Sequence, residues 1–413
     1  MIPAELAAAL LLAVQTQQFQ STPDRLRQGA PVEAFPTIDV AVIAFPSSGP
    51  PVGANVLFSR DHPDGRIAEF AGAFGSVRNV HFLADQRDAA GNSASWLPGA
   101  DWDRLTWRTL AGQADQPRFV APYPASLVKL MVLVGIAREI DSGRTTWSAP
   151  WTYRTETLPV RTWAERMIAV SSNDATSALV ALLHHVGAIV RTDGAEQRNR
   201  VHDAFTRYGL TTLRLSNTRP DGGWMNRDGA GVGELQMTAW DTARLLWLLD
   251  AAAPPPPWLE AGTPPLLADA SRAEVRALLS SQALHEVLSS TAVAGVPGWR
   301  PGIPARVPER WITPEGGVAA FELKRPSDIR AAQSAAEVQF DHKTGTTENF
   351  LSDAGIVVGI TPQRRHYIIA LLSNLGTRYA PTENTATTWK VPQLGAAIDA
   401  WLEARLEPKN PAH

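Results

Sequence analysis

The sequence predicts an α/β (α+β) fold in which a mostly antiparallel sheet is flanked by helices and joined to an all-helical lobe. One observation is that strand-like runs lie at both ends of the chain. Residues 38–45 form a β-rich apolar run, and residues 337–345, 353–360 and 366–374 read as three strands with short links. Short links are typical of an antiparallel meander. The other observation is that the middle of the chain has helical patterns, so we expect the terminal strands to share one sheet.

Each expected helix has its own signal. The opening residues, MIPAELAAALLLAVQTQQF, have a short apolar run with Glu5 before it and no positive region, which indicates a helix of the folded domain, with an atypical export signal as the alternative. A capping box of Ser271 and Glu274 predicts where another helix begins. By apolar periodicity, the expected helices are 158–170, 171–187, 238–253 (ended by prolines 254–257), 271–282 and 393–406.

These elements suggest two units. Residues 1–125 together with 337–413 are expected to build the sheet domain, and residues 126–336 a mainly helical lobe. Residues 48–117 are rich in Gly, Pro, Asp and Trp and are interpreted as an insertion or an elaborated sheet edge. Residues 298–335 are Pro- and Gly-rich and are interpreted as a second insertion.

Composition excludes several functions. The net charge of −3 and the pI near 6.3 argue against a nucleic-acid partner. The absence of cysteine removes disulfides, thiol nucleophiles and cysteine-bound metals. No run reaches the roughly 18 apolar residues of a membrane span. The adjacent His184 and His185 would point to different helix faces, so no metal site is expected, and no phosphate or dinucleotide fingerprint indicates a cofactor.

One lysine stands in an unexpected place. Only five of the 38 basic residues are lysines, yet Lys129 lies at the start of an apolar helix that continues as LMVLVGIAREI. Arginine stays charged, whereas a buried lysine can lose its proton and act as a base. Ser126 lies three residues earlier, on the same helix face, where a neutral lysine could activate it as a nucleophile. A helix-capping serine beside a snorkelling lysine is the structural alternative.

Two further stretches strengthen the catalytic interpretation. VSSNDATSA holds Ser171 and Asn173 at an expected helix start, and HKTGTT places Lys343 on an expected strand. The order S-x-x-K, S-x-N, K-T-G resembles the signature of the penicillin-recognising serine enzymes, which include serine β-lactamases and D-Ala-D-Ala peptidases. The resemblance covers about residues 36–47 and 118–406, and it implies a site where the sheet meets the helical lobe.

The resemblance implies catalytic roles for four side chains. Ser126 would be the acylated nucleophile and Lys129 its general base. Ser171 would pass a proton to the leaving group, and Lys343 would bias this proton network electrostatically. The backbone amides of Ser126 and Thr346 would form the oxyanion hole.

It also implies a set of substrate contacts. Asn173 would orient the substrate amide. Lys343 and Thr344 would hold the substrate carboxylate. Gly345 would leave room for the substrate to lie along the strand. His342, next to Lys343 on a strand, should face the opposite side and be packed or solvated.

The chain departs from the class A β-lactamase pattern in one respect. That class clears its acyl-enzyme with a glutamate in an E-x-x-L-N stretch, and no such stretch stands between the second and third motifs here. Residues 208–223 and the form SSNDA are more similar to D-Ala-D-Ala carboxypeptidases. We therefore expect acylation on Ser126 followed by slow release of β-lactams, or release through a base that the sequence does not identify.

The expected activity is that of a serine hydrolase acting on an amide, such as a β-lactam or a cell-wall peptide of the D-Ala-D-Ala type. The alternatives are an esterase or amidase on the same scaffold, and a sensor in which acylation is the signal. The resemblance implies a periplasmic or secreted protein, although the chain shows no clear signal peptide.

Overall fold

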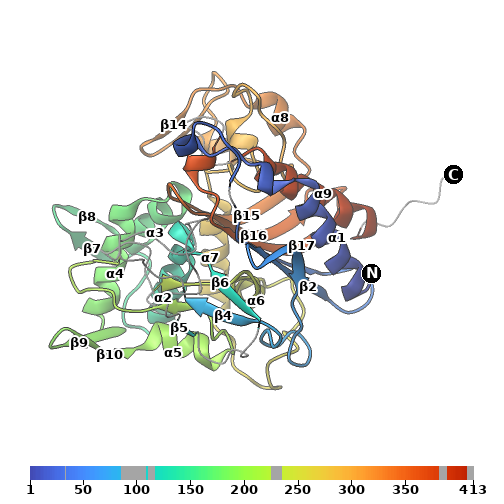
Figure 1. Cartoon of the computed structure of the whole chain (residues 1–413). Helices are drawn as coiled ribbons and strands as arrows, with labels where there is room; N and C mark the ends of the chain where they lie inside the picture. Colours follow the sequence, from blue (N-terminus) through green and yellow to red (C-terminus); the bar gives the residue numbers. More distant parts are fainter. Residues whose placement is uncertain (33, 85–107, 110–116, 225–234, 381–387, 407–413) are drawn as a thin grey trace.

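A six-stranded antiparallel sheet lies at the centre of the computed structural model (Figure 1). The structure describes residues 1–32, 34–84, 108–109, 117–224, 235–380 and 388–406. The strand order is β15-β16-β17-β1-β2-β3. The strands are β1 (Ile38–Ala44), β2 (Val52–Ser59), β3 (His62–Ile67), β15 (Val338–Thr346), β16 (Leu351–Gly359) and β17 (His366–Ser373). The expectation that both chain ends share one sheet is confirmed, because β1 pairs with β17, with Ile38 opposite Ser373.

The central strand β1 is buried on both faces, which explains its nearly continuous apolar sequence. Val40 and Val42 pack with α1 (Pro3–Thr16) and α9 (Lys390–Leu406) on one side. Ala41 and Ile43 join the larger core that extends into the helical lobe. Side chains of successive strand residues alternate between faces, so one strand contributes to both cores.

The helical lobe follows the sheet's first half and lies on one side of it (Figure 1). Its helices are α2 (Lys129–Asp141), α3 (Val160–Ala169), α4 (Asn173–His185), α5 (Arg200–Arg207), α6 (Ala239–Leu249) and α7 (Asp269–Ser280). Two-stranded ribbons lie between them: β7 (Pro150–Tyr153) with β8 (Glu156–Pro159), β9 (Ile189–Thr192) with β10 (Ala195–Asn199), and β11 (Arg214–Leu215) with β12 (Leu235–Gln236). Helix α6 packs against β1, β16 and β17, which joins the lobe to the sheet. Among the described residues, no helix has both the length and the apolar character to cross a bilayer.

The start of α7 was predicted wrongly. The helix begins at Asp269 after Ala268, two residues before the expected capping serine. Ser271 instead donates a hydrogen bond to Asp141 Oδ1 at 2.5 Å, and Glu274 pairs with Arg161 at 2.7 Å. Both side chains of the apparent capping box therefore serve contacts between helices, which local sequence does not reveal.

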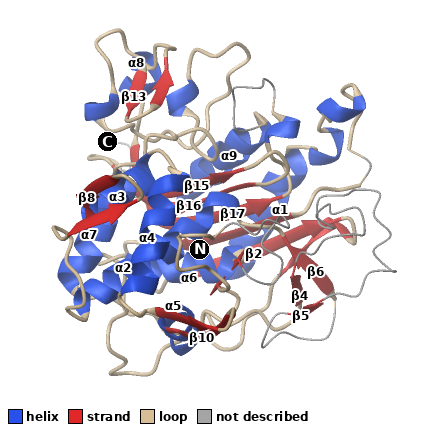
Figure 2. Ribbon diagram, turned by 90° about the vertical axis from the view of Figure 1, so that its left-hand side faces the viewer, coloured by secondary structure: helices blue, strands red, loops and turns tan. Residues whose placement is uncertain are grey.

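Residues 48–117 contribute to the main sheet as well as extending it. Strands β2 and β3 fall in this segment, and β3 is the sheet edge. A second, three-stranded sheet of β4 (His81–Ala84), β5 (Arg108–Thr109) and β6 (Arg118–Ala121) lies below β2 in both views (Figures 1 and 2). Part of the expected insertion lies outside the described residues.

Residues 298–335 form a small unit at one end of the molecule (Figure 2). It contains β13 (Val318–Ala320), β14 (Leu323–Arg325) and α8 (Arg330–Ser334), and its apolar residues pack with residues 283, 292 and 294 into a separate cluster. The unit contacts the helical lobe, because Arg310 pairs with Glu165 of α3.

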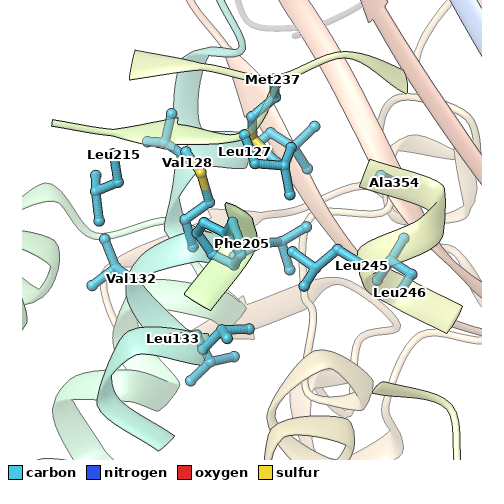
Figure 3. Packing of buried hydrophobic residues seen from close by; sticks show 14 of the residues in the cluster. Leu127, Val128, Val132, Leu133, Phe205, Leu215, Met237, Leu245, Leu246 and Ala354 are labelled. Atoms are coloured by element: carbon cyan, nitrogen blue, oxygen red, sulfur yellow. The ribbon is translucent and has the colours of Figure 1, made fainter. Parts of the chain in front are cut away.

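The larger core supports the segment before α2. Leu127 and Val128 are fully buried, and they pack in the same cluster as Phe205, Met237 and Leu245 (Figure 3). These partners come from α5, α6 and the segment that precedes α6. The residues that flank Ser126 in the chain are therefore fixed by a core built from several helices.

Candidate active site

Ser126 lies in a tight 3₁₀ turn, Ala125–Val128, immediately before α2. Ala125 has φ +51°, a left-handed conformation that is uncommon for residues with a Cβ. Leu127 N donates to Pro124 O at 3.1 Å, and the buried side chain of Leu127 anchors the turn. Ser126 itself is partly exposed, so its hydroxyl is presented from a rigid support.

The turn docks closely against strands β15 and β16. Ser352 Oγ of β16 donates to Pro124 O at 2.6 Å. A Cβ on Gly345 would lie 2.4 Å from Ser352 Oγ, 2.6 Å from Pro124 O and 2.7 Å from Leu127 N. The sequence predicts that Gly345 leaves room for a substrate. In the structure, Gly345 also allows the Ser126 turn to pack against β15, since any side chain there would push the turn away from the strand.

Four oxygen atoms surround the Lys129 amine. Its Nζ lies 3.0 Å from Ser126 Oγ, 2.9 Å from Ser171 Oγ and 2.9 Å from Asn173 Oδ1. It also donates to Ser171 O at 2.5 Å. The lysine is fully buried, so the amine contacts both serines away from bulk water. This geometry differs from a snorkelling lysine, whose amine would reach solvent.

Ser171 is held at the break between α3 and α4. Its φ of +60° is again left-handed, and Ser172 caps α4 by accepting from Ala175 N at 3.2 Å. The strained backbone points the Ser171 hydroxyl at two amines, because Oγ lies 2.9 Å from Lys129 Nζ and 3.0 Å from Lys343 Nζ. Strained residues of this kind cluster at functional sites.

Lys343 reaches the site from β15, the edge strand beside the Ser126 turn. It is fully buried and donates to Thr344 O at 2.6 Å. The Thr344 side chain is also buried, whereas Thr346 at the strand end is partly exposed and Asn173 is exposed. The partly open side of the site is therefore bordered by Ser126, Asn173 and Thr346.

Burial sets the electrostatics of the two lysines. Desolvation, followed by the charge of Lys343, holds the pKa of Lys129 well below its ordinary value. Desolvation also lowers the pKa of Lys343 to about 7, against the opposing effects of Asp353 and Glu286. A lysine whose pKa is lowered by burial gives up its proton more readily and can then act as a base.

The structure thus brings together Ser126, Lys129, Ser171, Asn173 and Lys343 in one hydrogen-bonded network. Of the other residues predicted from the sequence, Thr344 contributes its carbonyl, Gly345 holds the turn, and Thr346 lies at the end of β15.

A buried histidine pair lies on the other face of β15. His342 is fully buried, which is one of the two environments expected for it, and its Nδ1 lies 2.7 Å from Asp353 Oδ1. The ring also lies 4.5 Å from that of His285. Burial raises the pKa of Asp353 well above its ordinary value and lowers the pKa of both histidines, which favours an uncharged cluster behind the lysine.

The side chains of His184 and His185 have different partners and do not point to a common site. His184 Nε2 lies 3.0 Å from Thr218 Oγ1, and the ring of His185 lies 5.0 Å from that of Trp151. In the part of the chain that the structure describes, no group of three or more His, Asp or Glu side chains has the arrangement of a metal site.

Sequence reasoning missed two residues of the site. Ser352 is opposite Gly345 in the register of β15 and β16, and only that register would have revealed it. Trp224 lies over Lys129, with its ring centroid 5.5 Å from Nζ. The sequence gives little reason to single out Trp224, because the chain has fourteen tryptophans. The Gly-Gly pair before Trp224 does not indicate a catalytic role either.

No carboxylate forms an ion pair or hydrogen bond with Lys129 among the described residues. All four of its oxygen neighbours belong to hydroxyl or amide groups. Residues 225–234, which include Asp228 and Glu234, lie outside the described residues.

Comparison with known proteins shows the family to which the chain belongs. A family model described as the beta-lactamase enzyme family matches residues 120–401, which is more than half of the chain and includes Ser126, Asn173 and Lys343. No curated protein matches the chain.

Solved structures with similar folds include a protein described as PBP-A, at 14% identity and a TM-score of 0.46, covering 95% of this chain and 96% of that one. A β-lactamase from Sphaerobacter thermophilus has 13% identity and a TM-score of 0.47, covering 97% and 98%. A β-lactamase from Burkholderia vietnamiensis has 11% identity and a TM-score of 0.44, covering 94% of each chain.

Proposed function

Since the chain belongs to the beta-lactamase enzyme family, we propose that it is a serine hydrolase that forms an acyl-enzyme on Ser126, with Lys129 as the general base. The observation that carries the proposal is the position of the Lys129 amine, 3.0 Å from Ser126 Oγ in a buried setting that lowers its pKa. A neutral amine at hydrogen-bonding distance can take the proton of the hydroxyl as it attacks.

Acylation would proceed through the network around Lys129. Ser126 Oγ attacks the carbonyl carbon of a substrate amide, and its proton passes to Lys129 Nζ. Ser171 Oγ, 2.9 Å from that nitrogen, then delivers its own proton to the leaving amide nitrogen as the carbon–nitrogen bond breaks, and it takes in return the proton that Lys129 received from Ser126. The amides of Ser126 and Thr346 would stabilise the oxyanion. The product is an ester between Ser126 and the acyl group.

The substrate we propose is a β-lactam or a cell-wall peptide of the D-Ala-D-Ala type. Lys343 and Thr344 would recognise the carboxylate that such substrates carry, because an incoming anion favours the protonated form of Lys343 and accepts a charge-assisted hydrogen bond from it. Asn173 is exposed, so its amide can also reach a substrate. Such a substrate lies outside the cytoplasm, and members of this family are typically periplasmic or secreted, so we propose the same location here.

We propose that the acyl-enzyme turns over slowly with β-lactams. Lys129 has no carboxylate partner among the described residues, and a carboxylate there would be the simplest means to activate a hydrolytic water. Within the described part of the chain, the base near Ser126 Oγ is Lys129 itself.

The test is the intact mass of the protein over time after mixing with benzylpenicillin. We expect a persistent adduct in the wild type and none in Ser126→Ala. Ser148→Ala is the matched control, because Ser148 is exposed and its hydroxyl lies 3.3 Å from that of Thr146, away from the site.

Other outcomes identify the alternatives. An adduct that disappears as hydrolysed drug accumulates means an efficient β-lactamase with another base. No adduct, together with rapid turnover of short p-nitrophenyl esters that depends on Ser126, means an esterase or amidase. A permanent adduct without turnover of any peptide or ester means an acylated sensor.

A further inference from the structure

Trp224 packs beside the Lys129 amine. The indole centroid lies 5.5 Å from Nζ, and the side chain is 7% exposed within the main core cluster. The indole nitrogen is buried without an acceptor among the described residues, so packing fixes the ring. The amine therefore has polar neighbours, among them Ser126 and Ser171, and an aromatic neighbour in Trp224.

The turn before Trp224 is attached to the helical lobe. Gly222 has φ +88°, and a Cβ there would lie 2.4 Å from Ser177 O of α4. Tyr153 OH donates to Asp221 O at 3.0 Å. Only glycine allows both this conformation and this close approach, so the turn sits at a fixed place on the helix that begins with the active-site asparagine.

We propose that Trp224 determines the lifetime of the acyl-enzyme by excluding water from Lys129. This inference rests on the proposed acylation of Ser126. Hydrolysis requires a water oxygen to attack the ester carbonyl, the bond from that carbon to Ser126 Oγ to break, the proton of the water to pass to a base, and Ser126 Oγ to regain a proton. Lys129 is the base nearest to Ser126 Oγ among the described residues, so we assign it as the group to which this water hydrogen-bonds.

The geometry leaves such a water little access. Four oxygen atoms already lie within 3.0 Å of Nζ, and the indole ring lies next to the amine, with its centroid 5.5 Å from Nζ. Removing the ring would create a cavity beside a polar amine. Apolar cavities stay empty, whereas a cavity of sufficient size with polar groups in its wall takes up water. Smaller side chains at position 224 should therefore admit water in proportion to the space they leave.

The experiment measures the lifetime of the Ser126 benzylpenicillin adduct by intact mass in Trp224→Phe, Trp224→Leu and Trp224→Ala. We expect the lifetime to fall by about tenfold or more in the alanine variant, because water now reaches the amine. The leucine variant should be intermediate, and the phenylalanine variant should stay within about threefold of the wild type, because it retains most of the cover.

A second measurement separates access from loss of structure. Hydroxylamine attacks an ester without a protein base, so its effect on adduct release reports how open the ester is. We expect it to accelerate release more in Trp224→Leu than in the wild type. Trp401→Leu is the matched control, since Trp401 packs on the other face of the sheet, and its adduct lifetime should equal that of the wild type. Melting temperatures of all variants show which of them are folded.

The outcomes distinguish the two proposals. One outcome is that the adduct forms on Ser126 and has the same lifetime in the wild type and in the folded leucine and phenylalanine variants. This result overturns the role of Trp224 and leaves the proposed function intact. A wild-type adduct that is cleared within seconds also overturns it, because water then reaches the ester past the intact ring. Absence of any wild-type adduct overturns the proposed function, and the inference with it.

Discussion

Gly345→Ala should misplace the nucleophile without unfolding the protein. The new Cβ would lie 2.6 Å from Pro124 O and 2.7 Å from Leu127 N, whereas ordinary contacts begin at 3.4 Å. The Ser126 turn must therefore move by roughly 1 Å, and a shift of that size at a reacting group can cost about 100-fold in rate. Overpacking of a tight contact also costs about 1–3 kcal/mol of stability.

The assay is the second-order rate of acylation by benzylpenicillin, followed by intact mass in a quenched-flow series, with urea unfolding of the same samples. The control is Gly143→Ala. Gly143 has φ +73°, and a Cβ there would have no atom within 4 Å, so alanine strains the backbone by about 1–2 kcal/mol without touching the site. An acylation rate in Gly345→Ala within about threefold of the Gly143→Ala rate would refute the reasoning, because the contact with Pro124 would then not position Ser126.

Three other predictions concern charge. Lys129→Arg should abolish acylation at every pH, because arginine stays protonated, while Lys390→Arg should acylate normally; intact mass checks both. Lys343 has a pKa of about 7 when folded and about 10.5 when unfolded, so the unfolded state binds more protons between these values and stability rises with pH. Between pH 7 and pH 9, the free energy of unfolding should therefore rise by about 2 kcal/mol less in Lys343→Met than in the wild type, as measured by urea unfolding. Asp241→Asn should cost about 3–5 kcal/mol in urea unfolding, because it leaves the buried Arg244 without its partner at 2.8 Å; a loss below about 1 kcal/mol contradicts this.

The meander and the helical lobe could be predicted because their signals are local. The runs at 338–346, 351–359 and 366–373 have apolar residues at strand spacing with short links. The amphipathic pattern of 158–170 contains α3 within it. Periodicity of this kind depends only on neighbours along the chain.

Other features depend on neighbours that are distant in sequence. The start of α7 was misread because Ser271 and Glu274 bond to Asp141 and Arg161 on other helices. Ser352 and Trp224 act on Pro124 and Lys129 only after the sheet and the lobe have come together. The three motifs identified the candidate site because they carry reactive side chains, whereas supporting residues have no such chemical signature.

The pairing of β1 with β17 has a consequence for how the protein is made. Ile38 and Ser373 are opposite each other, so about 335 residues separate partners in the middle of the sheet. During synthesis, β1 leaves the ribosome together with β2 and β3 but long before its other neighbour, β17, exists, and the Ser126 turn is made before the β15 strand on which it docks. Non-local pairing of this kind slows folding. The Ser126 turn can therefore gain the geometry seen in the folded protein only after translation has passed residue 346, so any acylation that depends on this geometry must follow synthesis of β15.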